Sequence, residues 1–238
     1  MVYIFLVICN IIGLLHPDKV LVCHYTENPI KIDAQLNEKE WEFARSITLH
    51  DSRKRTDNQV IIRTLWDEQN LYVAFHVQDK DLQAKQTVLD HPQLYLDDMV
   101  EFLIDTRNDK DSCWNVDDVI YHINILGQKK DDRGTVNCIT NPQWNGNARY
   151  AVQLFGTLND TTDIDIGYDV EVSISWKELE TKPGSLSVDF AVGDSGKLFD
   201  WVGASPFRSP FAFGNLILRK KDEVLVNIKL PQISKQKF

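Results

Sequence analysis

Three polar side chains with complementary hydrogen-bonding properties fall on predicted β-strands of this chain. Apolar residues alternate through residues 100–104 and 119–125, so Glu101 points away from the first apolar face, and His122 and Asn124 point away from the second. If the two strands pair, a carboxylate, an imidazole and an amide share one sheet face. These groups can donate to and accept from the hydroxyl groups of a polar ligand, and an ordinary solvated sheet face is the alternative.

Four aspartates flank the predicted strands and offer oxygen ligands for a cation. Asp79 and Asp81 end one strand, and Asp97 and Asp98 begin another. Calcium binds several carboxylate and carbonyl oxygens contributed by loops, so these four residues are candidate calcium ligands. The spacing of an EF-hand loop is absent, and acidic solvated turns are the alternative interpretation.

Strand patterns dominate the elements that must position these residues. Apolar alternation indicates strands at residues 60–66 and 71–77, joined by a turn of Asp, Glu, Gln and Asn. Asn37 can cap a short helix over residues 38–45. We therefore expect an all-β fold, an antiparallel β-sandwich of the immunoglobulin or jelly-roll kind with one or two short helices. Further strands are expected at residues 100–104, 119–125, 168–174, 186–192 and 214–218.

The tryptophans divide into two groups by their sequence context. Trp41, Trp66 and Trp176 lie in apolar patterns, so we expect them in the core. Trp201 lies in a predicted loop, where packing under the loop and contact with a ligand both remain open. It is retained as a candidate ligand-binding residue.

Charge and terminal composition exclude some classes of protein. The formal net charge of −9 argues against nucleic acid binding, which needs clustered lysine and arginine. Residues 1–15 are nearly all apolar, which is too short to span a bilayer but fits the hydrophobic region of a secretory signal. We expect a signal peptide and leader at residues 1–24 and a secreted or cell-envelope protein. A first strand and a misplaced start codon are the alternatives.

The sequence does not decide whether two of the cysteines form a disulfide. Cys113 and Cys138 can pair across a loop in an oxidising compartment. Free buried thiols are equally consistent with the sequence.

Five segments in sequence order resemble family 9 carbohydrate-binding modules. The first is similar to the family's opening Pro-Ile-x-Ile-Asp followed by Leu, Glu and Trp, with Ala34 where glycine is usual. The others are similar to a Leu-Trp-Asp hairpin, an Asp-x-Val-Glu strand, a Gly-Tyr-x-Val-Glu strand ending in Trp, and a closing Phe-Gly-x-Leu. The matching residues are 29–41, 65–73, 98–105, 167–176 and 213–216.

The resemblance implies a β-sandwich over residues 25–221, followed by a C-terminal extension at 222–238. It also implies binding of sugar chain ends, often with stabilising calcium, in secreted proteins that act on plant polysaccharides. Two aromatic rings clamp the sugar in such modules, which points to Tyr95 and Phe207, although the family usually has tryptophan at both positions. The family's polar contacts map to Glu101, His122 with Asn124, and a position that is Ala191 here.

Three functions follow as hypotheses. The first is a secreted, non-catalytic module that binds oligo- or polysaccharides, with glycan-degrading enzymes as partners. The second is a structural or interaction domain that kept the fold and lost the sugar, which the replaced aromatic positions and Ala191 favour. The third is a glycoside hydrolase, which would need two carboxylates at a defined separation.

Overall fold

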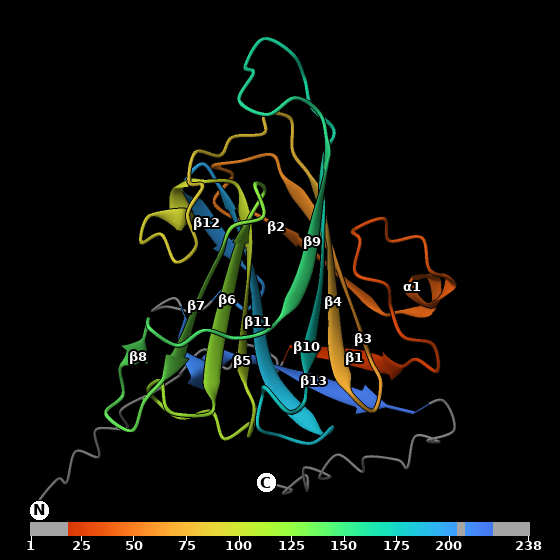
Figure 1. Cartoon of the computed structure of the whole chain (residues 1–238), viewed down its shortest axis with the longest axis vertical. Coiled ribbons are helices and arrows are strands. Elements are labelled where there is room, and N and C mark those ends of the chain that lie inside the picture. Colours follow the sequence, from red (N-terminus) through yellow and green to blue (C-terminus); the bar gives the residue numbers. More distant parts are fainter. Residues whose placement is uncertain (1–18, 204–207, 221–238) are drawn as a thin grey trace, which may run out of the picture.

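A computed structural model describes residues 19–203 and 208–220, which form a β-rich fold with little helix (Figure 1). The helical elements are one α-helix and two short 3₁₀ turns: α1 (Lys39–Phe43), η1 (Leu94–Leu96) and η2 (Pro210–Ala212). The strands are β1 (Val20–Tyr25), β2 (Ser46–His50), β3 (Gln59–Trp66), β4 (Asn70–Gln78), β5 (Met99–Asp105), β6 (Asp118–Asn124), β7 (Lys129–Gly134), β8 (Thr140–Asn141), β9 (Arg149–Phe155), β10 (Gly167–Ser175), β11 (Ser185–Asp194), β12 (Lys197–Asp200) and β13 (Gly214–Arg219).

The strands form one mixed sheet in the order β8-β7-β6-β5-β11-β13-β1-β3-β4-β10-β9, with β12 beside β11 and β2 beside β3. Most neighbours are antiparallel, as expected. Strand β1 is the exception, because it runs parallel to both β13 and β3. The purely antiparallel arrangement is therefore wrong at the centre of the sheet, although the all-β class is confirmed.

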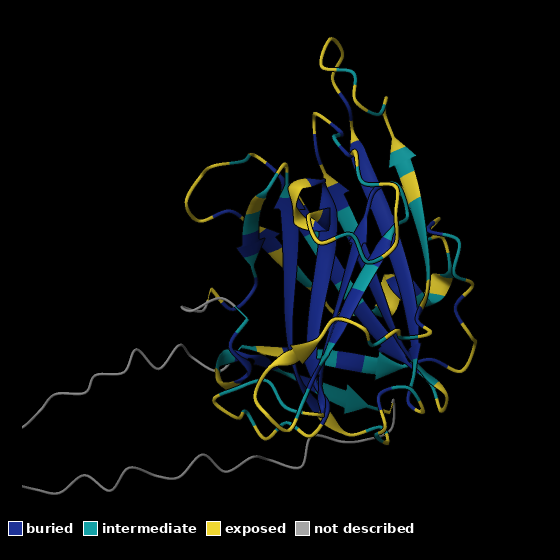
Figure 2. Cartoon of the chain, turned by 60° about the vertical axis from the view of Figure 1, so that its left-hand side comes forward, coloured by how far each residue is buried: buried dark blue, intermediate teal, exposed yellow. Residues whose placement is uncertain are grey.

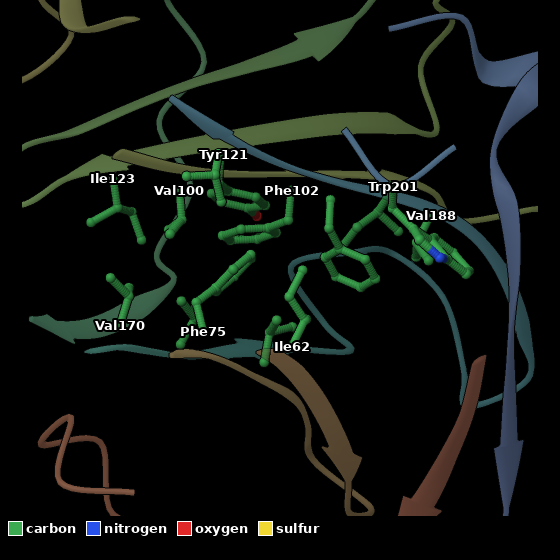
Figure 3. Packing of buried hydrophobic residues seen from close by; sticks show 14 of the residues in the cluster. Ile62, Phe75, Val100, Phe102, Tyr121, Ile123, Val170, Val188 and Trp201 are labelled. Carbon is green, nitrogen blue, oxygen red and sulfur yellow. The ribbon is translucent and has the colours of Figure 1, made fainter. Parts of the chain in front are cut away.

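The sheet curls so that its two halves face each other across the hydrophobic core. Figure 3 shows Phe102 and Tyr121 on one side and Phe75 and Val170 on the other. The Phe102 and Tyr121 rings stack with their centroids 4.9 Å apart, and Phe75 lies 6.3 Å from Phe102. Figure 2 shows most strands buried and many exposed residues in the loops, whereas the outer strands β8 and β9 are partly or largely exposed. This arrangement is consistent with a β-sandwich.

The predicted strand faces are confirmed. Val60, Ile62 and Trp66 of β3 are buried in the core, and the turn at residues 67–70 closes the hairpin with β4. Trp176 is buried as expected.

Helix α1 is shorter than predicted and is held by a different device. It begins after Glu38, and no side chain caps its N-terminus. The helix and the segment before it are held instead by Glu171 of β10. The Glu171 carboxylate accepts hydrogen bonds from the Trp41 indole of the helix at 2.9 Å and from the backbone of Asp33 and Ala34 in the preceding segment. Trp41 is buried against β3 and β4, as predicted for a core residue.

Strand β1 begins at Val20, inside the segment that we expected to be a leader. Leu21 and Cys23 of this strand are buried, so the folded sheet begins before residue 25. The rest of the predicted signal peptide, residues 1–18, and the predicted extension at 222–238 lie outside the described residues. No helix in the described part of the chain is long and apolar enough to cross a membrane.

Candidate functional site

Strands β5 and β6 place the three predicted polar residues on one face. They pair antiparallel with Glu101 opposite His122 and Met99 opposite Asn124. Because side chains alternate along each strand, Glu101, His122 and Asn124 all point away from the Phe102 and Tyr121 core. The shared sheet face predicted from the sequence is confirmed.

Glu101 is the centre of a charged network on this face. Its side chain is fully buried, and Arg208 donates to both of its oxygens, from Nε at 2.7 Å and from an Nη at 2.8 Å. His122 Nδ1 lies 3.1 Å from Oε2 of the same carboxylate. Burial by itself raises the pKa of Glu101, but His122 and Arg208 outweigh it and lower the pKa to about 2. Glu101 is therefore ionised, and its fork-to-fork pairing fixes the Arg208 guanidinium in one orientation.

His122 completes the network with one nitrogen and leaves the other unused. An ionised carboxylate only accepts hydrogen bonds, so His122 Nδ1 carries the proton that faces Glu101. Its Nε2 is buried and has no hydrogen-bond partner among the described residues. A buried polar atom without a partner is uncommon and is a candidate ligand contact.

Asn124 is already occupied by partners within the protein. Its amide nitrogen donates to the Gln86 carbonyl at 2.9 Å and to Asp97 Oδ2 at 2.8 Å, and its oxygen accepts from the Gln128 backbone. Both amide N–H groups are therefore used. Asn124 anchors the segment that leads into β5 and does not present donors to a ligand in this conformation.

The predicted aromatic residues do not all lie on the surface. Tyr95 lies in η1, which packs against β6 and β11, and is 44% exposed. Trp201 is 7% exposed and packs on Phe190 with the ring centroids 5.9 Å apart (Figure 3). Trp201 is thus a core residue in this structure. Phe207 lies outside the described residues.

Arg208 was not anticipated from the sequence, and the loop after β5 positions it. Trp114 of that loop donates from its indole nitrogen to the Arg208 carbonyl at 2.8 Å. The Trp114 ring also packs edge-on against Phe213 at 6.3 Å. Arg208 and Glu101 are 107 residues apart in the sequence, so no local pattern indicates that they pair.

The four predicted calcium ligands serve mainly to hold loops. Asp97 accepts from the backbone of Lys85 and Gln86, at 2.9 Å each. Asp98 accepts from two further backbone N–H groups, and burial, then nearby Asp79, raise its pKa to about 8. Asp79 accepts from Asn58 and from the backbone of Asp81. Asp81 accepts from Gln83 and is exposed.

A different trio of aspartates converges at the far end of β5 and β6. Ligand oxygens of Asp105, Asp117 and Asp118 lie within 4.8 Å of one another, and all three residues are buried. Within the described residues, neither oxygen of Asp117 accepts a hydrogen bond, and its nearest cation is Arg107 Nη1 at 3.6 Å. Burial raises the pKa of Asp118 to about 7, with the neighbouring aspartates adding to the effect.

The chemistry of this trio suits a hard divalent cation. Buried carboxylates close to one another repel, and a cation that binds all three removes that repulsion. Asp105 accepts from the backbone of residues 107, 108 and 110, so the loop is already folded around it. Neither oxygen of the buried Asp117 accepts a hydrogen bond among the described residues, although Arg107 pairs with Oδ1 at 3.6 Å, and this is the observation that points to a ligand.

The loop that carries this trio is also fixed covalently. Cys113 and Cys138 form a disulfide that joins it to the segment after β7. Of the two arrangements that the sequence left open, the paired one is present. Cys23 is a free, buried thiol.

The chain belongs to the family described as carbohydrate family 9 binding domain-like, whose model matches residues 32–221. This agrees with the five segments recognised in the sequence.

Solved structures show the same fold. A family 9 carbohydrate-binding module from Caldicellulosiruptor kristjanssonii, in complex with cellotriose, superposes with a TM-score of 0.65 at 21% identity and covers 90% of this chain and 100% of that one. The glucose complex described for that organism gives a TM-score of 0.63 at 20% identity, with 88% and 100% covered.

Curated relatives are much longer enzymes. The chain is 28% identical over 201 residues to endo-1,4-beta-xylanase A of Thermotoga neapolitana. The aligned residues cover 80% of this chain and 17% of the relative. It is 29% identical over 168 residues to exoglucanase XynX of Acetivibrio thermocellus. That alignment covers 67% of this chain and 13% of the relative. The chain thus spans less than a fifth of each relative's length.

Proposed function

We propose that this chain is a non-catalytic module that binds the ends of oligo- or polysaccharide chains beside Tyr95, at the face built on Glu101 and His122. Family membership supports a carbohydrate ligand, and the solved neighbours hold cellotriose and glucose. The observation that carries the proposal is the Arg208–Glu101–His122 network, a fixed set of charged hydrogen-bonding groups built on β5 and β6. The exposed Tyr95 lies on η1, which packs against β6.

Each part of the network has a role in the proposed binding. The Arg208 side chain is 35% exposed, so its guanidinium can reach sugar hydroxyls while Glu101 holds it in place. The Tyr95 ring offers a flat apolar surface to the C–H face of a pyranose and excludes water from the neighbouring hydrogen bonds. A preformed network loses little conformational entropy when a ligand binds.

The same network argues against hydrolysis by Glu101. A general acid for glycoside cleavage must be protonated near neutral pH. The pKa of Glu101 is instead lowered to about 2, chiefly by His122 and Arg208 acting against burial. Glu101 is suited to hold charge and not to deliver a proton.

A second candidate function is a structural or interaction domain without a sugar. It is favoured by Glu101 and Asn124, whose hydrogen-bonding groups are already engaged by protein partners. The two candidates differ in thermal stability, because a ligand that binds only the folded state raises the melting temperature. Cellotriose raises it under the first proposal and leaves it unchanged under the second.

Replacing Tyr95 by alanine is expected to weaken cellotriose binding about tenfold, because one aromatic contact contributes roughly 1 to 1.5 kcal/mol. The change lies at an exposed position, so the fold should be retained. Isothermal titration calorimetry of the two proteins with cellotriose measures the difference.

The matched control is Phe155→Ala, which removes a partly exposed ring from β9, a strand at the other end of the sheet order. Its affinity for cellotriose should equal that of the unchanged protein. If the Tyr95→Ala variant binds cellotriose as tightly as the unchanged protein does, the sugar does not bind beside Tyr95.

We further infer that calcium binds at Asp105, Asp117 and Asp118 and stabilises the loop between β5 and β6. The trio offers carboxylate oxygens within 4.8 Å of one another, and neither Asp117 oxygen accepts a hydrogen bond among the described residues. The expected set at Asp79, Asp81, Asp97 and Asp98 remains the alternative location.

Calcium at one hundred times its dissociation constant should stabilise the protein by about 2.7 kcal/mol. Thermal unfolding with excess calcium and with a chelator measures this difference. Asp117→Asn should abolish it, whereas the exposed control Asp163→Asn should retain it. If Asp79→Asn abolishes the difference and Asp117→Asn does not, the calcium lies in the alternative set.

A secreted or cell-envelope location and glycan-degrading partners complete the proposal. The Cys113–Cys138 disulfide supports an oxidising compartment. The named relatives, a xylanase and an exoglucanase, support a role beside enzymes that degrade polysaccharides.

A further inference from the structure

A pocket lies between the end of β1 and helix α1, remote in the sheet from Glu101. Its volume is about 450 Å³, within the range of roughly 300–1,000 Å³ typical of small-molecule sites. Figure 1 shows α1 beside β1 and β3, away from β5 and β6. The pocket is lined by His24, Tyr25, Thr26, Glu27, Asn28, Glu40, Phe43 and Leu65.

Two aromatic rings form its apolar wall. Phe43 ends α1 and is 76% exposed, so its ring is available to a ligand. Tyr25 is supported from behind, because its ring packs edge-on against Trp66 with the centroids 5.0 Å apart. Lys220 Nζ lies 4.9 Å from the Tyr25 centroid, so part of that ring is covered and Phe43 is the more open platform.

The polar rim is held rigid by hydrogen bonds within the protein. Asn28 Nδ2 donates to Glu40 Oε1 at 2.7 Å, which ties the chain after β1 to α1. Thr26 Oγ1 donates to the Asn28 carbonyl at 2.7 Å and accepts from the Asn28 backbone. A rim fixed in advance reduces the entropy lost when a ligand binds.

The chemistry of the rim suits hydroxyl groups. Burial, and secondarily Arg45, lower the pKa of His24, so a neutral imidazole offers one donor and one acceptor. The exposed Asn28 adds an amide with one N–H left after its bond to Glu40, whereas the buried Thr26 hydroxyl is used within the rim. The carboxylates of Glu27 and Glu40 repel anionic ligands such as acidic sugars and phosphates.

We propose that this pocket is a second saccharide site, in which one neutral pyranose unit packs on Phe43 and hydrogen-bonds to the rim. The inference takes its ligand class from the proposed function but uses none of the residues of the Glu101 face. Two sites on one module would let it bind two sugar chains, or one chain twice, and so raise its avidity for an insoluble polysaccharide.

Titration of the full chain with cellotriose, followed by amide NMR shifts, tests the proposal. We expect two separate groups of shifted amides, one around Tyr95 and Glu101 and one around Asn28 and Phe43. Phe43→Ala should weaken binding at the second group about tenfold and leave the first unchanged. Phe155→Ala, which removes a partly exposed ring on β9, should change neither.

The outcomes separate this inference from the proposed function. Shifts only around Tyr95 would overturn the second site and leave the first. Shifts only around Phe43, lost in Phe43→Ala, would support the second site and overturn the first. Tetramethylammonium is the competing probe, because aromatic rings with carboxylates can also hold a cation. Shifts around Phe43 with that ion, and none with cellotriose, would overturn the saccharide assignment.

Discussion

Replacing Arg208 by alanine is expected to lower the free energy of unfolding by about 3 kcal/mol, the low end of the cost of breaking a buried ion pair. The substitution removes the two hydrogen bonds that the Arg208 guanidinium donates to the fully buried Glu101 carboxylate. Among the described residues, only His122 would then pair with that charge, at 3.1 Å. The partial exposure of Arg208 lets water compensate in part, which is why the low end applies. Urea unfolding of both proteins measures the change.

A double-mutant cycle isolates the ion pair from the other interactions of Arg208. Glu101→Gln removes the charge that Arg208→Ala leaves unpaired, so the double variant should be more stable than the sum of the single effects predicts. Strictly additive effects would contradict a direct coupling between the two side chains.

The pH dependence provides a second check on the same pair. The folded-state pKa of Glu101 is lowered from 4.5 to about 2 by His122 and Arg208 against the effect of burial. A lowered pKa means that the stabilisation is present above about pH 4.5 and is lost as the pH falls towards 2. The stability difference between the unchanged protein and Glu101→Gln should narrow over that range.

Much of the fold follows from local alternation. The β3–β4 hairpin depends on a two-residue period and a short turn, which the sequence displays directly. The common face of Glu101 and His122 depends on the same period, once β5 and β6 pair across their long connecting loop. The central position of β1 does not follow, because its residues fall within the segment expected to be a leader and its partners β13 and β3 are distant in sequence. Parallel pairing leaves no hairpin signal.

The site was less predictable than the fold, for a physical reason. Alternation indicates the face on which a side chain points but not the partner that approaches it. Asn124 was assigned to the correct face, yet its amide serves Asp97 and Gln86. Trp201 occurs in a loop-like context, yet its ring closes the core beneath Gly214, where an added Cβ would lie 2.4 Å from the indole.

Long-range partners carry the least sequence signal. Arg208 reaches Glu101 from a loop. Of the three converging aspartates, Asp117 lies in the polar loop between β5 and β6, and Asp105 and Asp118 are the strand ends that flank it. A run of Asp and Asn in a polar loop is equally typical of solvated turns. Only the folded structure shows that Asp117 is buried and that neither of its oxygens accepts a hydrogen bond among the described residues.

Replacing both Cys113 and Cys138 by serine is expected to lower the free energy of unfolding by about 3.5 kcal/mol. The bridged cysteines are separated by 25 residues, and a cross-link that closes a loop of this length restricts the unfolded chain by roughly that amount. Guanidinium unfolding of the unchanged protein and of the double variant measures the difference.

Dithiothreitol provides the matched control for the disulfide. Reduction should destabilise the unchanged protein by about the same amount and leave the double variant unaffected, since Cys23 is a free thiol in both. An unchanged protein that is insensitive to reduction would show that the bridge does not contribute to stability. Because Trp114 follows Cys113 and donates to the Arg208 carbonyl, the double variant should also bind cellotriose more weakly. Loss of stability with full affinity would show that the disulfide loop does not position Arg208.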